Sequence, residues 1–216
     1  MSQSMSQSMS QSMSQSMTRR VASDAVVGLL LAAGRGRRFD PLGQRNKLLQ
    51  PIDGEPVVVH SARHLLAVLP RVVAVVRDGG DAVAAQLAAL GCEVVECAEA
   101  DSGMAASLVH GLRHAEAAVG WVVALGDMPR VLPATIAALA RAVEEGADIA
   151  VPVHGNASGK ERGNPVAFGR RHLPQLLALS GDRGARGIVK DNIVNEVAVD
   201  DPGILLDIDT PPDLLQ

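Results

Sequence analysis

A glycine-rich, basic segment follows the first long apolar run of the chain. Gly34 and Gly36 alternate with arginines, Arg38 follows them, and Lys47 lies a little further along. Glycine lets backbone N–H groups approach phosphate oxygens, and guanidinium and ammonium groups neutralise their charge. The dinucleotide fingerprint G-x-G-x-x-G fails because Phe39 stands at its third glycine, and no Gly-Lys-Ser/Thr of a P-loop follows. The segment therefore predicts a triphosphate-binding loop, with a basic surface turn as the alternative.

Two acidic segments could supply a metal site. Asp127 stands in Leu-Gly-Asp-Met-Pro, and Asp207 and Asp209 stand in Leu-Asp-Ile-Asp-Thr-Pro-Pro. A Mg²⁺ ion that accompanies a triphosphate asks for one or two carboxylates. If residues 205–209 form a strand, both carboxylates of that segment project to one face. The alternative is that Asp209 or Thr210 caps a helix that begins at the prolines. We predict a metal–triphosphate site formed by Asp127 and the carboxylates of this second acidic segment, beside the glycine loop.

Apolar runs and helical stretches alternate along the chain, which indicates how these groups are positioned. Such alternation predicts an α/β fold: a single domain with a mostly parallel, Rossmann-like three-layer αβα sandwich. Ligands of such sheets bind outside the carboxyl ends of the strands, where the glycine loop and Asp127 fall. The expected strands are 25–33, 72–76, 93–96, 121–125, 148–151 and 166–168, and the expected helices are 56–69, 81–90, 104–118 and 133–145.

The two ends of this pattern differ from its middle. Residues 1–22 begin with four copies of Met-Ser-Gln-Ser and predict a disordered low-complexity tail, which leaves 23–216 as the folded domain. After residue 151 the rhythm breaks into a Gly/Asn/Ser-rich stretch, 153–164, which predicts a loop within a substrate-facing insertion.

Composition argues against two classes of partner. The formal net charge is −4 and only three residues are aromatic, so neither the basic field nor the stacking platforms of nucleic-acid binders are expected. No apolar run approaches the roughly 20 residues of a membrane span. Arg19-Arg20 before the apolar run at 25–33 mimics an export signal, but Asp24 interrupts it, so we expect a cytoplasmic protein.

The cysteines and paired histidines predict no further chemistry. Cys92 and Cys97 match neither a zinc pair nor a redox Cys-x-x-Cys, so we expect small core residues in a reducing compartment. Histidines stand one helical turn apart at 60 and 64 and again at 110 and 114, without a glutamate in register. Solvated helix faces are a better explanation for them than zinc ligands.

Five ordered blocks of the sequence resemble the nucleotidyltransferases of molybdenum cofactor maturation. The resemblance runs from about Gly28 to Leu214. The blocks are LLLAAGRGRRF at 29–39 with Lys47, GMAASLVHGL at 103–112, LGDMP at 125–129, GNPVAF at 163–168 with GDRGAR at 181–186, and DIDTPPDL at 207–214.

The resemblance implies a role for each matching residue. It implies that the glycine loop, Arg38 and Lys47 hold the triphosphate, that the Gly-Met-x-x-Ser block approaches base and ribose, and that Asp127 and Asp209 hold Mg²⁺. It gives Arg38, Lys47 and Asp127 as catalytic. The implied nucleotide-binding residues are Leu31, Ala32, Ala33, Gly34, Gly36, Arg38, Lys47, Gly103 and Ser107. The implied acceptor-binding residues are Asn164, Pro165, Asp182 and Arg186.

Two departures from the family pattern concern the substrate-binding loops. About four extra residues, Pro41–Arg45, lengthen the loop before Lys47. Where the family has Gly-His-Pro this chain has Gly163-Asn164-Pro165, which keeps a polar side chain but removes a titratable one.

Ala33 predicts the base. This chain has Leu-Ala-Ala-Gly at 31–34, which resembles the cytidylyl-transferring members of the family. The guanylyl-transferring members tend to have Leu-Ala-Gly-Gly there. The resemblance therefore implies Mg²⁺-dependent transfer of CMP from CTP to molybdopterin, giving pyrophosphate and the cytosine dinucleotide, with a molybdoenzyme as client. The alternatives are another nucleoside triphosphate, another phosphorylated acceptor, or a non-catalytic partner in cofactor insertion.

Overall fold

The computed structural model describes residues 25–156, 159–182 and 184–215. These residues form one eight-stranded sheet in the order β10-β7-β9-β6-β1-β4-β5, with β8 paired to β7. The predicted tail, 1–22, lies outside the described residues.

The sheet is built on β1 (Val26–Ala32), whose apolar residues are buried on both faces. It lies parallel to β4 (Val72–Arg77) and β6 (Gly120–Leu125), and β4 lies parallel to β5 (Glu93–Cys97). A strand covered on both faces needs a continuous apolar run, which is what 26–32 supplies.

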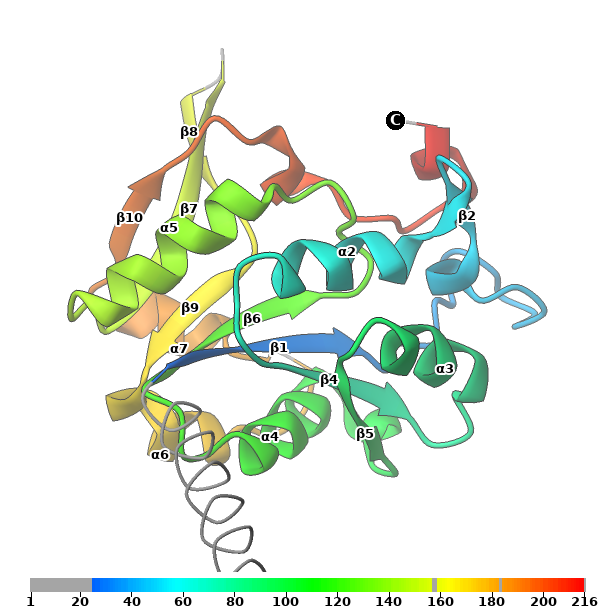
Figure 1. Cartoon of the computed structure of the whole chain (residues 1–216), viewed down its shortest axis with the longest axis horizontal. Coiled ribbons are helices and arrows are strands. Elements are labelled where there is room, and N and C mark those ends of the chain that lie inside the picture. The colour runs from blue at the N-terminus through cyan, green and yellow to red at the C-terminus, as the bar shows by residue number, and fades with distance from the viewer. Residues whose placement is uncertain (1–24, 157–158, 183, 216) are drawn as a thin grey trace, which may run out of the picture.

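Helices cover both faces of the sheet (Figure 1). One core cluster includes buried residues of α2 (Val57–Leu66), α3 (Asp81–Ala89) and α5 (Pro133–Glu144). The other includes residues of α4 (Met104–His114), α6 (Leu173–Leu177) and α7 (Arg186–Asp191). The predicted α/β sandwich is confirmed. The helix predicted over 104–118 is shorter in the structure, since α4 ends at His114 and a turn leads into β6. In that turn the Ala115 carbonyl accepts a hydrogen bond from Trp121 Nε1 at 3.0 Å.

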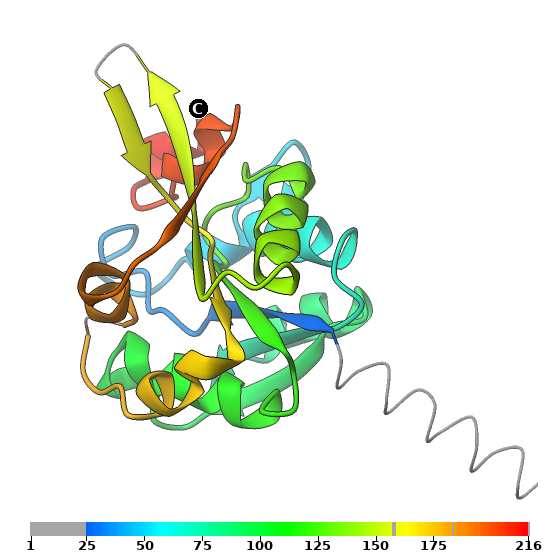
Figure 2. The same ribbon diagram turned by 90° about the vertical axis from the view of Figure 1, so that its left-hand side faces the viewer.

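The prediction of a loop over 153–164 was wrong. Strand β7 (Ile149–Asn156) continues past residue 151, and β8 (Gly159–Arg162) returns antiparallel to it. Figure 2 shows this hairpin extending beyond the body of the sheet. Strands of a hairpin that faces solvent can carry polar side chains and still pair through their backbones, so the polar composition of 153–164 did not reveal them.

Two further strands complete this side of the sheet. The predicted strand near 166–168 is β9 (Val166–Gly169), which lies antiparallel to both β6 and β7. Strand β10 (Asn195–Ala198), which was not predicted, lies parallel to β7.

Asp207 and Asp209 do not lie in a strand, contrary to prediction. Residues 206–209 have no sheet pairing, and Ile208 N donates to Asp127 O at 2.9 Å. The alternative, a cap formed by the Asp209 or Thr210 side chain, differs from the structure too, in which Asp213 Oδ2 accepts from Asp209 N at 2.9 Å and from Thr210 N at 2.6 Å. This backbone hydrogen bond and the burial of Ile208 in the core thus hold the segment beside the turn that follows β6.

Both cysteines are buried and free, as predicted, and lie in different core clusters. Among the described residues, no helix combines the length and apolar character needed to cross a bilayer.

Candidate active site

A cavity of about 650 Å³ opens at the carboxyl ends of β1 and β6. The glycine loop, the first turns of α4 and the 207–209 segment all contribute to its wall. Each residue implied to bind nucleotide lines it, from Leu31 to Ser107, together with Asp127 and Asp209. The structure therefore brings together residues that the sequence predicts for one site, while their roles in binding stay predictions.

Gly36 allows the glycine loop to turn over Lys47. Its φ is +62°, a left-handed conformation, and its carbonyl accepts from Phe39 N at 2.9 Å and from Asp40 N at 3.0 Å. A Cβ at Gly36 would lie 3.3 Å from Lys47 Cγ, whereas Gly34 has open space where its Cβ would be. Glycine is favoured at position 36 by the left-handed conformation and by the close approach of the Lys47 side chain, whereas the backbone at Gly34 is open to a ligand.

The extra residues 41–45 fold around Asp40. Its carboxylate accepts from Leu42 N at 3.1 Å and from Arg45 N at 2.6 Å, and the Arg45 bond is the main reason why the pKa of Asp40 is lowered. Asn46 Oδ1 then accepts from Leu48 N at 3.0 Å and begins the turn that carries Lys47. The longer loop therefore does not prevent Lys47 from reaching the site.

Lys47 joins the two carboxylates predicted to hold metal. Its Nζ lies 2.5 Å from Asp127 Oδ2 and 3.4 Å from Asp209 Oδ1, and Arg38 forms an ion pair with the other oxygen of Asp209. The Lys47 side chain is 10% exposed and each of these aspartates 20%. The site thus holds two partly buried carboxylates that are paired with a buried lysine and an exposed arginine.

Gly126 and Ile208 bring these carboxylates together. Gly126 N donates to Leu31 O at 2.9 Å, and a Cβ at Gly126 would lie 3.2 Å from Ala32 Cβ. The bond from Ile208 to the Asp127 carbonyl holds the later segment against the same strand end.

Asp207 is an exposed carboxyl next to Asp209, outside the wall of the nucleotide cavity. Desolvation first, and then the negative charges of Asp209 and Asp127, raise the pKa of Asp207. The strand interpretation placed Asp207 beside Asp209, but Asp207 was not among the metal ligands that the resemblance implies. Because carboxylate oxygens are the donors that a hard divalent cation prefers, the residues present fit such an ion.

Asp101 is a residue that the sequence did not reveal. It lines the same cavity, and its carboxylate pairs with Arg35, whose Nε lies 2.7 Å away, and with Arg77 Nη2 at 2.5 Å. These two guanidinium groups hold the pKa of Asp101 well below its usual range. No pattern in the sequence links the three residues, which come from separate elements.

The predicted acceptor residues divide among three places. Asn164 and Arg186 line a neighbouring cavity of about 350 Å³, which shares Leu31, Met104 and Leu125 with the larger one. Arg162, which was not predicted, lines it too.

The other two acceptor predictions fall elsewhere. Asp182 lines the larger cavity, where a Cβ at Gly103 would lie 2.5 Å from Asp182 Oδ1. Pro165 is buried and lines a small apolar cavity with Ser61 and His64. Pro165 does not line the Asn164 cavity, although its neighbours Asn164 and Val166 do.

Comparison with known proteins places this geometry in a family. The sequence profile of the MobA-like NTP transferase domain matches residues 28–197. The chain belongs to this family. It is a nucleotidyltransferase, as predicted.

Individual relatives are similar over nearly their whole length. The molybdenum cofactor guanylyltransferase of Cupriavidus pinatubonensis is 31% identical over 201 residues, 90% of this chain and 96% of the relative. The structure of Rv0371c from Mycobacterium tuberculosis in complex with manganese is 30% identical, with a TM-score of 0.69, over 88% of this chain and 95% of that one. A nucleotidyl transferase from Methanothermobacter thermautotroptrophicus is 26% identical, with a TM-score of 0.72, over 88% of this chain and 94% of that one.

Proposed function

We propose that this chain transfers a nucleotidyl group from a nucleoside triphosphate to the phosphate of molybdopterin and releases pyrophosphate. The observation that carries the proposal is the cluster of Lys47, Arg38, Asp127 and Asp209 under the glycine loop. The adjoining Asn164 cavity supplies room for an acceptor, and the curated relative's name supports molybdopterin as that acceptor.

In the proposed reaction an acceptor phosphate oxygen forms a bond to the α-phosphorus, while the bond from that phosphorus to the bridging oxygen of pyrophosphate breaks. The acceptor oxygen is already ionised, so no general base is needed, and catalysis consists of alignment and charge stabilisation. The backbone N–H groups around Gly34 and Gly36 bind phosphate oxygens, and the Lys47 ammonium and Arg38 guanidinium neutralise charge on the leaving pyrophosphate.

Asp127 and Asp209 would hold a divalent cation, with Asp207 beside them. When bound, such an ion neutralises phosphate charge and aligns the triphosphate. We propose Mg²⁺ for this chain, since oxygen donors and a triphosphate suit it. The manganese complex of Rv0371c supports a divalent ion in this kind of protein without selecting between the two metals.

We propose CTP as the donor, on the basis of Ala33. Ala33 is 5% exposed and lines the nucleotide cavity. The Ala33 methyl group narrows the cavity at a point where glycine would leave room for a bicyclic base. One such group is worth about 1–3 kcal/mol, so we expect a roughly ten- to two-hundredfold preference for CTP over GTP in kcat/KM. The second candidate is GTP, which the guanylyltransferase relatives favour.

The test is to incubate the protein with molybdopterin, Mg²⁺ and each nucleoside triphosphate in turn, and to identify the product by its mass. A cytosine dinucleotide is expected, with Ala33→Gly narrowing the preference. A guanine dinucleotide would refute the CTP assignment while leaving the reaction intact. The absence of any dinucleotide, with pyrophosphate released on another phosphorylated acceptor, would refute molybdopterin.

We also propose the cytoplasm as the compartment, because the two free, buried thiols suit a reducing environment. A molybdoenzyme that receives the product is the proposed client.

A further inference from the structure

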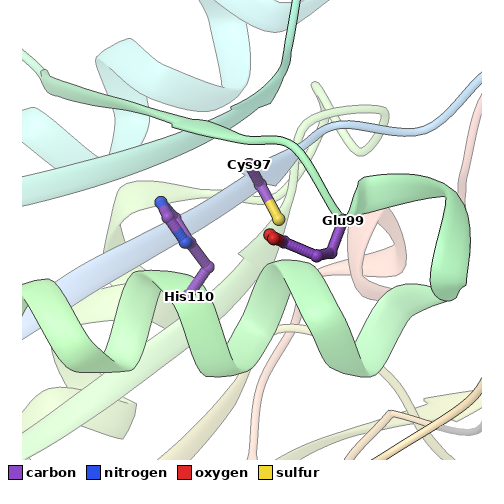
Figure 3. Close-up of side chains that lie close together, drawn as sticks. All are labelled: Cys97, Glu99 and His110. Atoms are coloured by element: carbon purple, nitrogen blue, oxygen red, sulfur yellow. The ribbon is translucent and has the colours of Figure 1, made fainter.

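Three side chains with metal-binding donors meet between α4 and the end of β5. Cys97 ends β5, Glu99 lies in the turn that follows, and His110 lies on α4. One ligand atom from each lies within 4.8 Å of the other two. Figure 3 shows the Cys97 sulfur and the Glu99 carboxylate close together, with the ring of His110 rising from the helix beside them.

The donor set differs in kind from that of the nucleotide cavity. A thiolate, an imidazole and one carboxylate are ligands that Zn²⁺ accepts in proteins, whereas Mg²⁺ takes oxygen ligands. Three protein ligands leave a fourth position of a tetrahedral ion for water. The cluster is therefore suited to a borderline-soft cation.

We propose that Cys97, Glu99 and His110 bind one Zn²⁺ ion per chain, at a site separate from the Asp127–Asp209 cluster. Binding replaces the thiol proton, which passes to the solvent, by a sulfur–zinc bond, so no oxidant or reductant is involved.

The sulfur is already held by polar groups. Cys97 is 1% exposed, and although burial raises the pKa of its thiol, hydrogen bonds from the Glu99 backbone and the Ser107 side chain oppose that rise. His110 is half-buried, and its ring centroid lies 5.0 Å from that of His114, one turn along α4.

An ion at this position would fix the turn between β5 and α4. Ala100, Asp101 and Gly103 of that turn line the nucleotide cavity, as does Ser107, which hydrogen-bonds the Cys97 sulfur. The site therefore has a structural role next to the donor pocket, and its occupancy adds to stability because an unfolded chain presents no preformed site.

Cobalt titration of the full chain tests the proposal directly, since Co²⁺ reports thiolate ligation by absorption. We expect one equivalent to give sulfur-to-cobalt charge-transfer absorption and tetrahedral d–d bands, both abolished by one equivalent of Zn²⁺. Cys97→Ala should lose the charge-transfer absorption, and His110→Ala should lose the tetrahedral bands. Cys92→Ala, which removes the other buried thiol, and His114→Ala, one turn along α4, should retain both.

Circular dichroism and the more conservative Cys97→Ser show whether each variant folds. Absence of charge-transfer absorption in the wild-type chain would overturn the proposal, as would its persistence in a folded Cys97→Ser variant. Cobalt bands without a sulfur contribution, lost in Asp127→Asn, would place the ion only at the carboxylate cluster and would equally overturn it.

Discussion

Replacing Lys47 by Met tests whether the carboxylate cluster is built to hold positive charge. Methionine keeps an unbranched side chain against Gly36, so the packing of the loop is largely preserved. The change removes the ammonium that lies 2.5 Å from Asp127 and 3.4 Å from Asp209. Among the described residues, Arg38, whose side chain is 77% exposed, then remains as the cation paired with this cluster, through Asp209.

The distances set the size of the effect. At an effective dielectric constant of about 20, Coulomb's law gives an attraction of about 7 kcal/mol at the shorter distance and about 5 kcal/mol at the longer one. Desolvation of Lys47 offsets most of this attraction. Removing one partner of a buried ion pair costs about 3–5 kcal/mol, and since both aspartates are 20% exposed we expect about 2–4 kcal/mol. For a domain of this size that lowers Tm by about 4–16 °C.

Thermal unfolding is then measured in EDTA and in a series of Mg²⁺ concentrations, with Lys190→Met, an exposed lysine on α7, as the matched control. The Lys47→Met chain should be stabilised by Mg²⁺ more than the wild type, because the divalent charge no longer competes with the ammonium. A concentration of 100 times the Kd is worth about 2.7 kcal/mol. In contrast, Lys190→Met should behave as the wild type does in both media.

Two results would refute this reasoning. An unchanged Tm of Lys47→Met in EDTA would show that the carboxylates do not repel one another enough to matter. Equal Mg²⁺ stabilisation of Lys47→Met and wild type would show that the cation binds elsewhere.

Three further predictions concern single side chains. Asp127→Asn should lower kcat for pyrophosphate release about 10²–10³-fold while leaving Tm within a few degrees of wild type, with Asp148→Asn as the control. Near-full turnover of Asp127→Asn would show that Asp127 does not hold the metal. Because the pKa of Asp101 is lowered in the folded state, its ionised carboxylate stabilises the fold above the unfolded-state pKa, and this stability is lost as the pH falls through the acid range. The free energy of unfolding in urea should therefore change less between pH 7 and pH 3 for Asp101→Asn than for wild type, and an equal change would contradict this. Burial raises the pKa of Cys92 to about 11, so at pH 8 about one Cys92 thiol in a thousand is ionised. Alkylation of Cys92 should therefore be slow until urea unfolds the chain. Rapid labelling of Cys92 in the native chain would show that the thiol is accessible.

The amino-acid sequence by itself determined the central strands and the edge of the sheet at which chemistry occurs. A continuous apolar run such as 26–32 can be buried only inside a covered sheet, and parallel strands carry their following loops to one edge. That is why the glycine loop after β1 and Asp127 after β6 could be predicted to face one cavity, although they are far apart in the chain.

Only the tertiary structure decided how the site is closed. Lys47 and Asp209 are 162 positions apart, and the segment of Asp209 is held near Lys47 by the backbone bond from Ile208 N to Asp127 O and by the burial of Ile208 in the core, which no local pattern encodes. The pairing of Asp101 with its arginines has the same origin, as does the approach of His110 to Cys97. Side-chain spacing predicts contacts within a helix or strand, but contacts between elements follow from how the shared core packs, and that is a property of the whole fold.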